Sequence, residues 1–192
     1  MQNDKPLAGK TIAILVSNGF EEVQMTEPQR ALLAAGATLK IVSTEQGLVN
    51  GWHEKAWGHY FAVDVPLSNA LAADFDAVLI PGGERGVAKL AANPHTKRIL
   101  RGFADAGKPI AALGVAPQLL ALSERIQGRT VVANDSVRET LEAAGAKLAD
   151  EAETVVVDGS LITARDDLDM PAFKGAVVEH FTTVAASLAA AA

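Results

Sequence analysis

The stretch Lys10–Ser17, KTIAILVS, indicates the class of fold because it is a continuous apolar run rich in β-branched residues. A strand that is buried on both faces of a sheet has this composition, without the alternation of a half-exposed strand. A second such run, Thr38–Ser43, follows after enough residues for one helix. We place that helix after Thr26 as its N-cap, with Pro28 in its first turn and Gly36 at its end. This strand–helix–strand opening predicts a parallel sheet.

The later elements follow the order expected of an α/β chain. We predict a strand over 76–80, a helix over 96–106, a strand over 109–113, a helix capped by Ser136 and Glu139 and ended by Gly145, a hairpin over 154–163 and a helix from Pro171. Residues 47–65 break the pattern, and we expect a hairpin there on the edge of the sheet. The chain is therefore expected to be one α/β domain over 1–192, an αβα sandwich of flavodoxin-like winding with a mostly parallel sheet. Residues 1–9 and 185–192 are expected to fray.

Composition limits the classes of function. The 192 residues are 49% hydrophobic and 21% charged, which is typical of a soluble globular protein. The net charge is −6 and the basic residues are scattered, which argues against a nucleic-acid partner. The chain has no cysteine, which excludes disulfides, thiolate metal sites and a cysteine nucleophile. No apolar run approaches the roughly 18–20 residues of a membrane helix, and the N-terminal residues lack the apolar core typical of a signal peptide. We expect a cytoplasmic protein with no membrane partner.

The segment Pro109–Leu120, PIAALGVAPQLL, predicts a strand, a tight corner of small residues and a helix that opens with proline. In many α/β enzymes a corner of this kind presents a nucleophile beside backbone N–H groups that hold an oxyanion. Here the corner consists of Gly114, Val115 and Ala116. The segments that follow two other strands, Asn18–Gln24 and Pro81-Gly82-Gly83, are expected at the same edge of the sheet. Glycines 82 and 83 would let their backbone approach the corner closely.

Together these motifs resemble the ThiJ/PfpI family, whose fold is that of the class I glutamine amidotransferases. The resemblance covers roughly residues 10–181. Its motifs include GFEEVQMTEP at 19–28, VLIPGG at 78–83, GKPIAA at 107–112, PQLL at 117–120 and VVVDG at 155–159. The resemblance implies a homodimer. We expect neither a cofactor nor a metal.

The chain departs from the family pattern at three functional positions. The family's corner reads alanine-isoleucine-cysteine-histidine-glycine-proline, so its nucleophilic cysteine maps to Gly114 and the adjacent histidine to Val115. The family's glutamate, four residues before a proline, maps to Gln24. None of these side chains is a nucleophile or an ionisable acid or base. We expect a non-catalytic member, with a stress response as one setting, that binds an unidentified small molecule or partner. Its vestigial pocket comprises Gln24, Glu21, Glu22, Gly82, Gly83, Gly114, Val115 and Ala116.

The alternative is an enzyme of the family type: a hydrolase (peptidase or amidase), a deglycase or a glyoxalase. Its chemistry would then have moved to Glu21, Glu22 or a histidine from a neighbouring chain. The histidines at 53 and 59 lack the spacing of a zinc-protease helix, and Asp166, Asp167 and Asp169 lack that of an EF-hand. We interpret the aspartates as a solvated loop.

An aromatic group lies at Trp52, Trp57, Tyr60 and Phe61. Three interpretations stay open: a local core, a dimer contact or a wall of the pocket.

Overall fold

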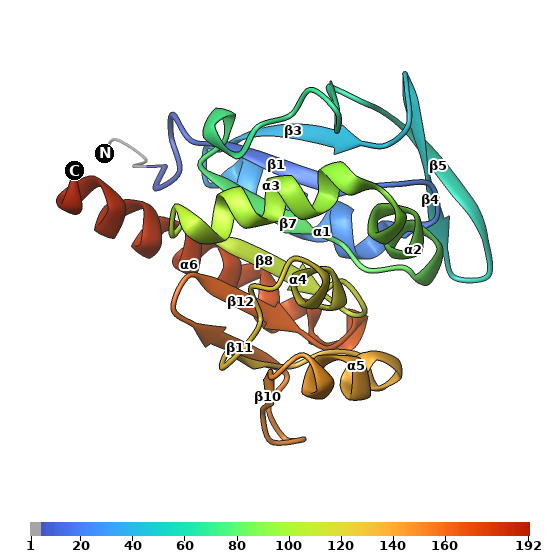
Figure 1. The fold of residues 1–192 in the computed structure, drawn as a ribbon. Helices are drawn as coiled ribbons and strands as arrows, with labels where there is room; N and C mark the ends of the chain where they lie inside the picture. The colour runs from blue at the N-terminus through green and yellow to red at the C-terminus, as the bar shows by residue number, and fades with distance from the viewer. Residues whose placement is uncertain (1–4) are drawn as a thin grey trace.

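A seven-stranded sheet lies between two layers of helices in the computed structural model, which describes residues 5–192 (Figure 1). All its strands pair in parallel except β11, which runs antiparallel to β12. The predicted αβα sandwich with a mostly parallel sheet is therefore confirmed. In spatial order the strands are β11 (Val155–Asp158), β12 (Leu161–Ala164), β8 (Ile110–Leu113), β7 (Ala77–Ile80), β1 (Thr11–Val16), β3 (Thr38–Ser43) and β6 (Val65–Pro66).

The order of the parallel strands decides where a site can form. From β3 through β1, β7 and β8 to β12, the strands follow the flavodoxin-like order 2-1-3-4-5. The chain leaves β1 toward one side of the sheet and returns on the other side as β7. Loops at the carboxyl ends of these two strands therefore diverge and leave a crevice between them, where ligands bind in open α/β sheets.

Both faces of the sheet are covered because the strand residues alternate between two apolar cores. Ile12, Ile14 and Val16 of β1 belong to the core beneath α1 (Glu22–Ala34) and α6 (Met170–Ala191). Ala13 and Leu15 belong to the core beneath α2 (Glu84–Ala92), α3 (Pro94–Asp105) and α4 (Gln118–Leu122). No helix within residues 5–192 combines the length and the apolar character needed to cross a membrane.

The remaining elements are short. They are the parallel pair β9 (Thr130–Val131) and β10 (Lys147–Leu148), the helix α5 (Arg138–Ala143), and the single-turn helices η1 (Ala72–Asp74), η2 (Asp135–Val137) and η3 (Asp167–Asp169). Of the ends expected to fray, residues 1–4 lie outside the described part of the chain. Leu7 is buried and α6 continues to Ala191. The single domain over 1–192 and its frayed ends stay predictions.

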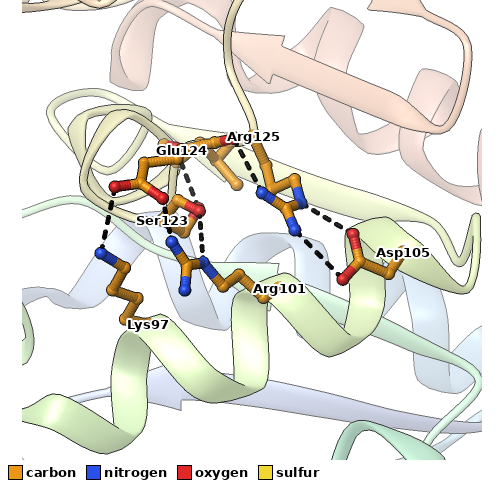
Figure 2. Close-up of polar contacts among 7 residues, drawn as sticks. Lys97, Arg101, Asp105, Ser123, Glu124 and Arg125 are labelled. Carbon is orange, nitrogen blue, oxygen red and sulfur yellow. Dashed lines mark hydrogen bonds and ion pairs between the residues drawn. The ribbon is translucent and has the colours of Figure 1, made fainter.

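Ion pairs attach α3 to the end of α4, the short helix that follows the corner (Figure 2). Lys97 and Arg101 on α3 both reach the Glu124 carboxylate. Arg125 donates two hydrogen bonds to Asp105, at 2.7 and 3.2 Å. Exposed pairs of this kind contribute about 0–1 kcal/mol each, so they add little to the stability of the fold.

The hairpin expected over residues 47–65 is confirmed, but its place differs from the prediction. β4 (Leu48–His53) and β5 (Ala56–Ala62) pair antiparallel. They do not extend the main sheet, whose edge strand is β6; they form a separate sheet with β2 (Phe20–Glu21). The ring of Phe20 packs edge-on against Phe61, with centroids 5.7 Å apart, which attaches the hairpin to the segment after β1.

The first helix begins five residues earlier than predicted. α1 starts at Glu22, not after Thr26, and Pro28 lies inside it. A proline removes one backbone donor from a helix and normally marks its first turn. Here the buried side chains of Met25 and Leu32 on the same helix outweigh that local preference.

The helix near Ser136 also starts differently. The backbone N and Oγ of Ser136 both donate to Asn134 Oδ1, and α5 begins at Arg138 without a side-chain cap. The predicted capping box therefore does not form. The helix α2 was not predicted, because glycines 82, 83 and 86 favoured a turn in that segment.

A glycine pair tests the packing of α2. A Cβ on Gly86 would lie 2.8 Å from Phe20 N and 2.9 Å from Ser17 O, backbone atoms that cannot rotate away. A Cβ on Gly175, in α6, would meet nothing within 4 Å. We expect Gly86→Ala to lower the free energy of unfolding by about 1–3 kcal/mol. Gly175→Ala should raise it by about 0.5–1 kcal/mol, since alanine favours a helix. Urea denaturation measures both; equal effects would contradict this packing.

Candidate functional site

The corner after β8 is held in a left-handed backbone conformation. Gly114 has φ +60°, a value that costs other residues about 1–3 kcal/mol. Its N–H donates to Ala164 O at 3.0 Å, and its carbonyl accepts from Asn134 N at 2.9 Å. The corner is therefore clamped between the end of β12 and the loop before η2.

The buried amide of Gln24, on α1, connects two loops beside this corner. Its Oε1 accepts a hydrogen bond from Gly82 N at 2.8 Å, and its Nε2 donates to Asp167 Oδ1 at 2.7 Å. A Cβ on Gly114 would lie 3.1 Å from the same Oε1. The amide therefore occupies the space next to the corner, where a side chain on residue 114 would point.

Two glycines let the loop after β7 approach closely. A Cβ on Gly82 would lie 2.9 Å from Leu113 O, and one on Gly83 would lie 2.5 Å from Glu21 N. Gly83 also has φ +101°. Glu21 N donates to Gly82 O at 2.9 Å, so this loop joins β2 to the corner.

A cavity of about 440 Å³ opens beside Gly114. Of the eight predicted pocket residues, the structure brings five together around it: Glu21, Gln24, Gly83, Gly114 and Val115. The other three do not line it. Gly82 packs against Gln24 and the corner, Ala116 is buried in the core, and Glu22 turns toward the hairpin.

Five lining residues were not predicted: Glu84, Asn134, Asp166, Asp167 and Leu168. The aspartate segment is part of a cavity wall rather than merely a solvated loop. It follows β12, the neighbour of β8, so its place at this edge of the sheet was available from the strand order. Leu168, at the rim, is 88% exposed.

The cavity is acidic. Its ionisable lining residues are all carboxylic acids: Glu21, Glu84, Asp166 and Asp167. None of the four takes part in the ion pairs found within residues 5–192. Burial raises the pKa of Glu21 to about 7, and the nearby charge of Asp167 acts in the same direction. Glu21 is therefore half-protonated near neutral pH.

Glu22 serves the hairpin instead. His59 N donates to its Oε2 at 2.9 Å, and His59 Nδ1 lies 2.6 Å from its Oε1. Burial alone would raise the pKa of Glu22, but the hydrogen bonds from His59 outweigh it and hold the pKa below its ordinary value. The two neighbouring glutamates thus have opposite environments.

Among residues 5–192, no histidine lines this cavity. His180 is buried, with Nε2 3.0 Å from Ser160 O, and burial lowers its pKa. Residues 5–192 contain no cluster of three or more histidine, cysteine or acidic side chains arranged to hold a metal ion.

The aromatic group is not a wall of this cavity either. Trp52 packs edge-on against Trp57, with ring centroids 5.4 Å apart, and Phe61 packs on Phe20.

Comparisons with known proteins agree with this architecture. The profile of the DJ-1/PfpI family matches residues 10–180. General stress protein 18 of Bacillus subtilis is 35% identical over 166 residues, covering 86% of this chain and 94% of that protein. YraA of the same organism, provisionally named a cysteine protease, is 34% identical over 165 residues. The match covers 85% of this chain and 94% of that protein.

Two solved structures share the fold. A two-domain protein of Anabaena variabilis, with DJ-1/ThiJ/PfpI-like and ferritin-like domains, superposes with a TM-score of 0.82 and 30% identity. The match covers 88% of this chain and 47% of that one, so this chain spans about half of it. A ThiJ/PfpI domain protein of Brachyspira murdochii has a TM-score of 0.82 and 24% identity. The match covers 92% of this chain and 98% of that one.

The ionisation of Glu21 can be read from stability. Its pKa rises from 4.5 to about 7 on folding, so the native state holds a proton that the unfolded chain releases in this range. Stability should therefore fall as the pH rises from about 4.5 to about 7. We expect Glu21→Gln to melt at a higher temperature than the wild type at about pH 8, with the difference shrinking toward about pH 5.

Thermal unfolding followed across that pH range measures the effect. The matched control is Glu179→Gln, an exposed glutamate on α6. If Glu21→Gln keeps the pH dependence of the wild type, Glu21 is not the group that titrates.

Proposed function

Because the chain belongs to the DJ-1/PfpI family, we propose that it is a member that binds a small ligand in the cavity beside Gly114 without covalent catalysis there. The main observation behind this proposal is that the corner has no nucleophile: residue 114 is glycine and the chain contains no cysteine. The cavity of about 440 Å³ is nevertheless open and large enough for a small ligand.

The groups around the corner support binding rather than covalent chemistry. Val115 supplies an apolar side chain where the family places a histidine, and Gln24 supplies a neutral amide where it places a glutamate. Gly82 N–H, a candidate oxyanion donor, is already bonded to Gln24. Val115 N–H donates to no acceptor within residues 5–192 and is left for a ligand oxygen.

The charge of the lining indicates the kind of ligand. Four carboxylic acids without cationic partners repel an anion and attract a protonated amine, and the low dielectric of a cavity strengthens both effects. A small cationic or neutral ligand fits this cavity; a carboxylate or phosphate does not.

The biological setting is proposed from a relative. The similarity to a protein named general stress protein 18 supports a stress-related role. The homodimer and the cytoplasmic location stay predictions.

Isothermal titration calorimetry with three molecules of equal chain length tests the ligand charge. We expect putrescine to bind, 1,4-butanediol to bind more weakly and succinate not to bind, with putrescine affinity falling as salt screens the carboxylates. The double variant Glu21→Gln/Glu84→Gln should weaken putrescine binding roughly tenfold or more, through loss of charge attraction. Glu179→Gln should leave it unchanged. Succinate binding as tightly as putrescine would contradict an acidic ligand site.

A second candidate function rests on Glu21. A carboxyl with a pKa of about 7 in a cavity is suited to act as a general acid or base at neutral pH. The chain would then process a carbonyl or amide substrate without a covalent intermediate, as a glyoxalase, deglycase or hydrolase.

Turnover assays separate the two functions. The purified protein is assayed for methylglyoxal consumption and for peptidase and amidase activity. We expect no rate above background, because no side chain at the corner can carry the family's covalent step. A measurable rate that disappears in Glu21→Gln and persists in Glu179→Gln would favour the second function over non-catalytic binding.

A further inference from the structure

The hairpin of β4 and β5 contains a bulge that gathers its aromatic side chains. Asn50 pairs with Tyr60 and Trp52 pairs with Trp57, so one residue on β4 opposes two on β5. Side chains alternate along a regular strand, and residues three apart point to opposite faces. The extra residue in β5 reverses that alternation and brings Trp57 and Tyr60 to one face.

The carboxylate of Glu22 stabilises the bulge through a backbone hydrogen bond. It accepts from the backbone N of His59, one of the two residues that oppose Gly51. A Cβ on Gly51 would lie 2.8 Å from Glu22 Oε2, and one on Gly58 would clash with the same atom. With the Glu22 carboxylate held in this position, neither Gly51 nor Gly58 has room for a Cβ.

A hollow of about 360 Å³ lies at this bulge, lined by Asn18, Asn50, Trp57 and Tyr60. It shares no lining residue with the acidic cavity. Trp57 and Tyr60 are 53% and 67% exposed, which is unusual for large aromatic side chains on a short hairpin. Trp52 is less available, because the Arg85 guanidinium lies over its ring at 4.1 Å.

Two amide side chains, those of Asn50 and Asn18, line the hollow. Asn50 is only 9% exposed, and its Oδ1 is buried without a hydrogen-bond partner. Its backbone N donates to Asn18 Oδ1 at 2.7 Å, which draws the second amide alongside. Asn50 Oδ1 itself has almost no accessible surface, so a ligand in the hollow would contact other atoms of Asn50 and Asn18.

From this combination we infer that the hollow is a second binding site, and that its ligand is a sugar ring. Aromatic faces contact the C–H face of a pyranose, which is flat and apolar, while amides donate to and accept from its hydroxyl groups. The lining has no charged side chain to pair with an ionic ligand. Neutral hydroxyl groups on a rigid ring match all four residues.

The intrinsic tryptophan fluorescence of the chain can be used to follow binding at this site. Its two tryptophans, Trp52 and Trp57, both belong to this face of the hairpin. We expect methyl glucoside, methyl mannoside or methyl galactoside to change the tryptophan fluorescence of the full-length protein in a saturable manner, at millimolar concentrations. Sorbitol has similar hydroxyl groups but no rigid ring face, and should produce no saturable change.

Two variants test whether the glycoside binds in this hollow. Tyr60→Ala removes an exposed ring, keeps both tryptophans and should weaken binding roughly tenfold, the effect of a lost stacking contact. Asn50→Ala should weaken it as well, and circular dichroism shows whether that variant folds. Val157→Ala, a matched exposed position on β11, should bind like the wild type.

Three outcomes overturn the inference. They are no saturable change up to the solubility of the glycosides, an equal response to sorbitol, and unchanged affinity in a folded Tyr60→Ala. If Tyr60→Ala instead changes the oligomeric state while no glycoside binds, this face is a contact between copies of the chain. None of these results bears on the acidic cavity, so the two sites are tested separately.

Discussion

The arrangement of the acidic cavity depends on one buried amide. Gln24 pairs with Gly82 N on one side and with Asp167 on the other, directly beside Gly114. These contacts join the first helix, the loop after β7 and the loop after β12. Leaving the Gly82 N–H unpaired in the interior would cost about 1–3 kcal/mol, so the amide is a structural requirement of the corner. The glycines around it are needed because the backbones approach more closely than a Cβ allows.

At the junction between β2 and α1, the adjacent residues Glu21 and Glu22 have different roles. Glu21 is the last residue of β2 and faces the cavity, where burial raises its pKa to about 7. Glu22 begins α1 and faces the hairpin, where hydrogen bonds from His59 hold its pKa below the ordinary value. The same local change from strand to helix therefore places one ionisable group in the cavity and uses the next to shape the aromatic hollow.

The cavity lies where a catalytic corner would lie, and the loops around it approach one another as closely. The side chains at the corner differ from those of a catalytic one. A glycine with φ +60° relieves the backbone strain that a nucleophile at this position would bear. The lining is acidic, and the proposed binding of a neutral or cationic molecule rests on that charge. Membership of the DJ-1/PfpI family accounts for the fold and for the location of the site, while the side chains of this chain decide what the site can do.

The sequence by itself determined the parallel sheet, the two hairpins and the small-residue corner, because apolar runs and turn residues act over a few neighbouring positions. It also determined that residue 114 has no side chain. Only the tertiary structure decided that α1 begins at Glu22 despite Pro28, and that β2 pairs with β4. It alone placed the aspartates after β12 in the cavity wall. The physical reason is distance along the chain: the bond from Gln24 to Asp167 spans 143 residues. No local pattern encodes which side chains such a contact brings together.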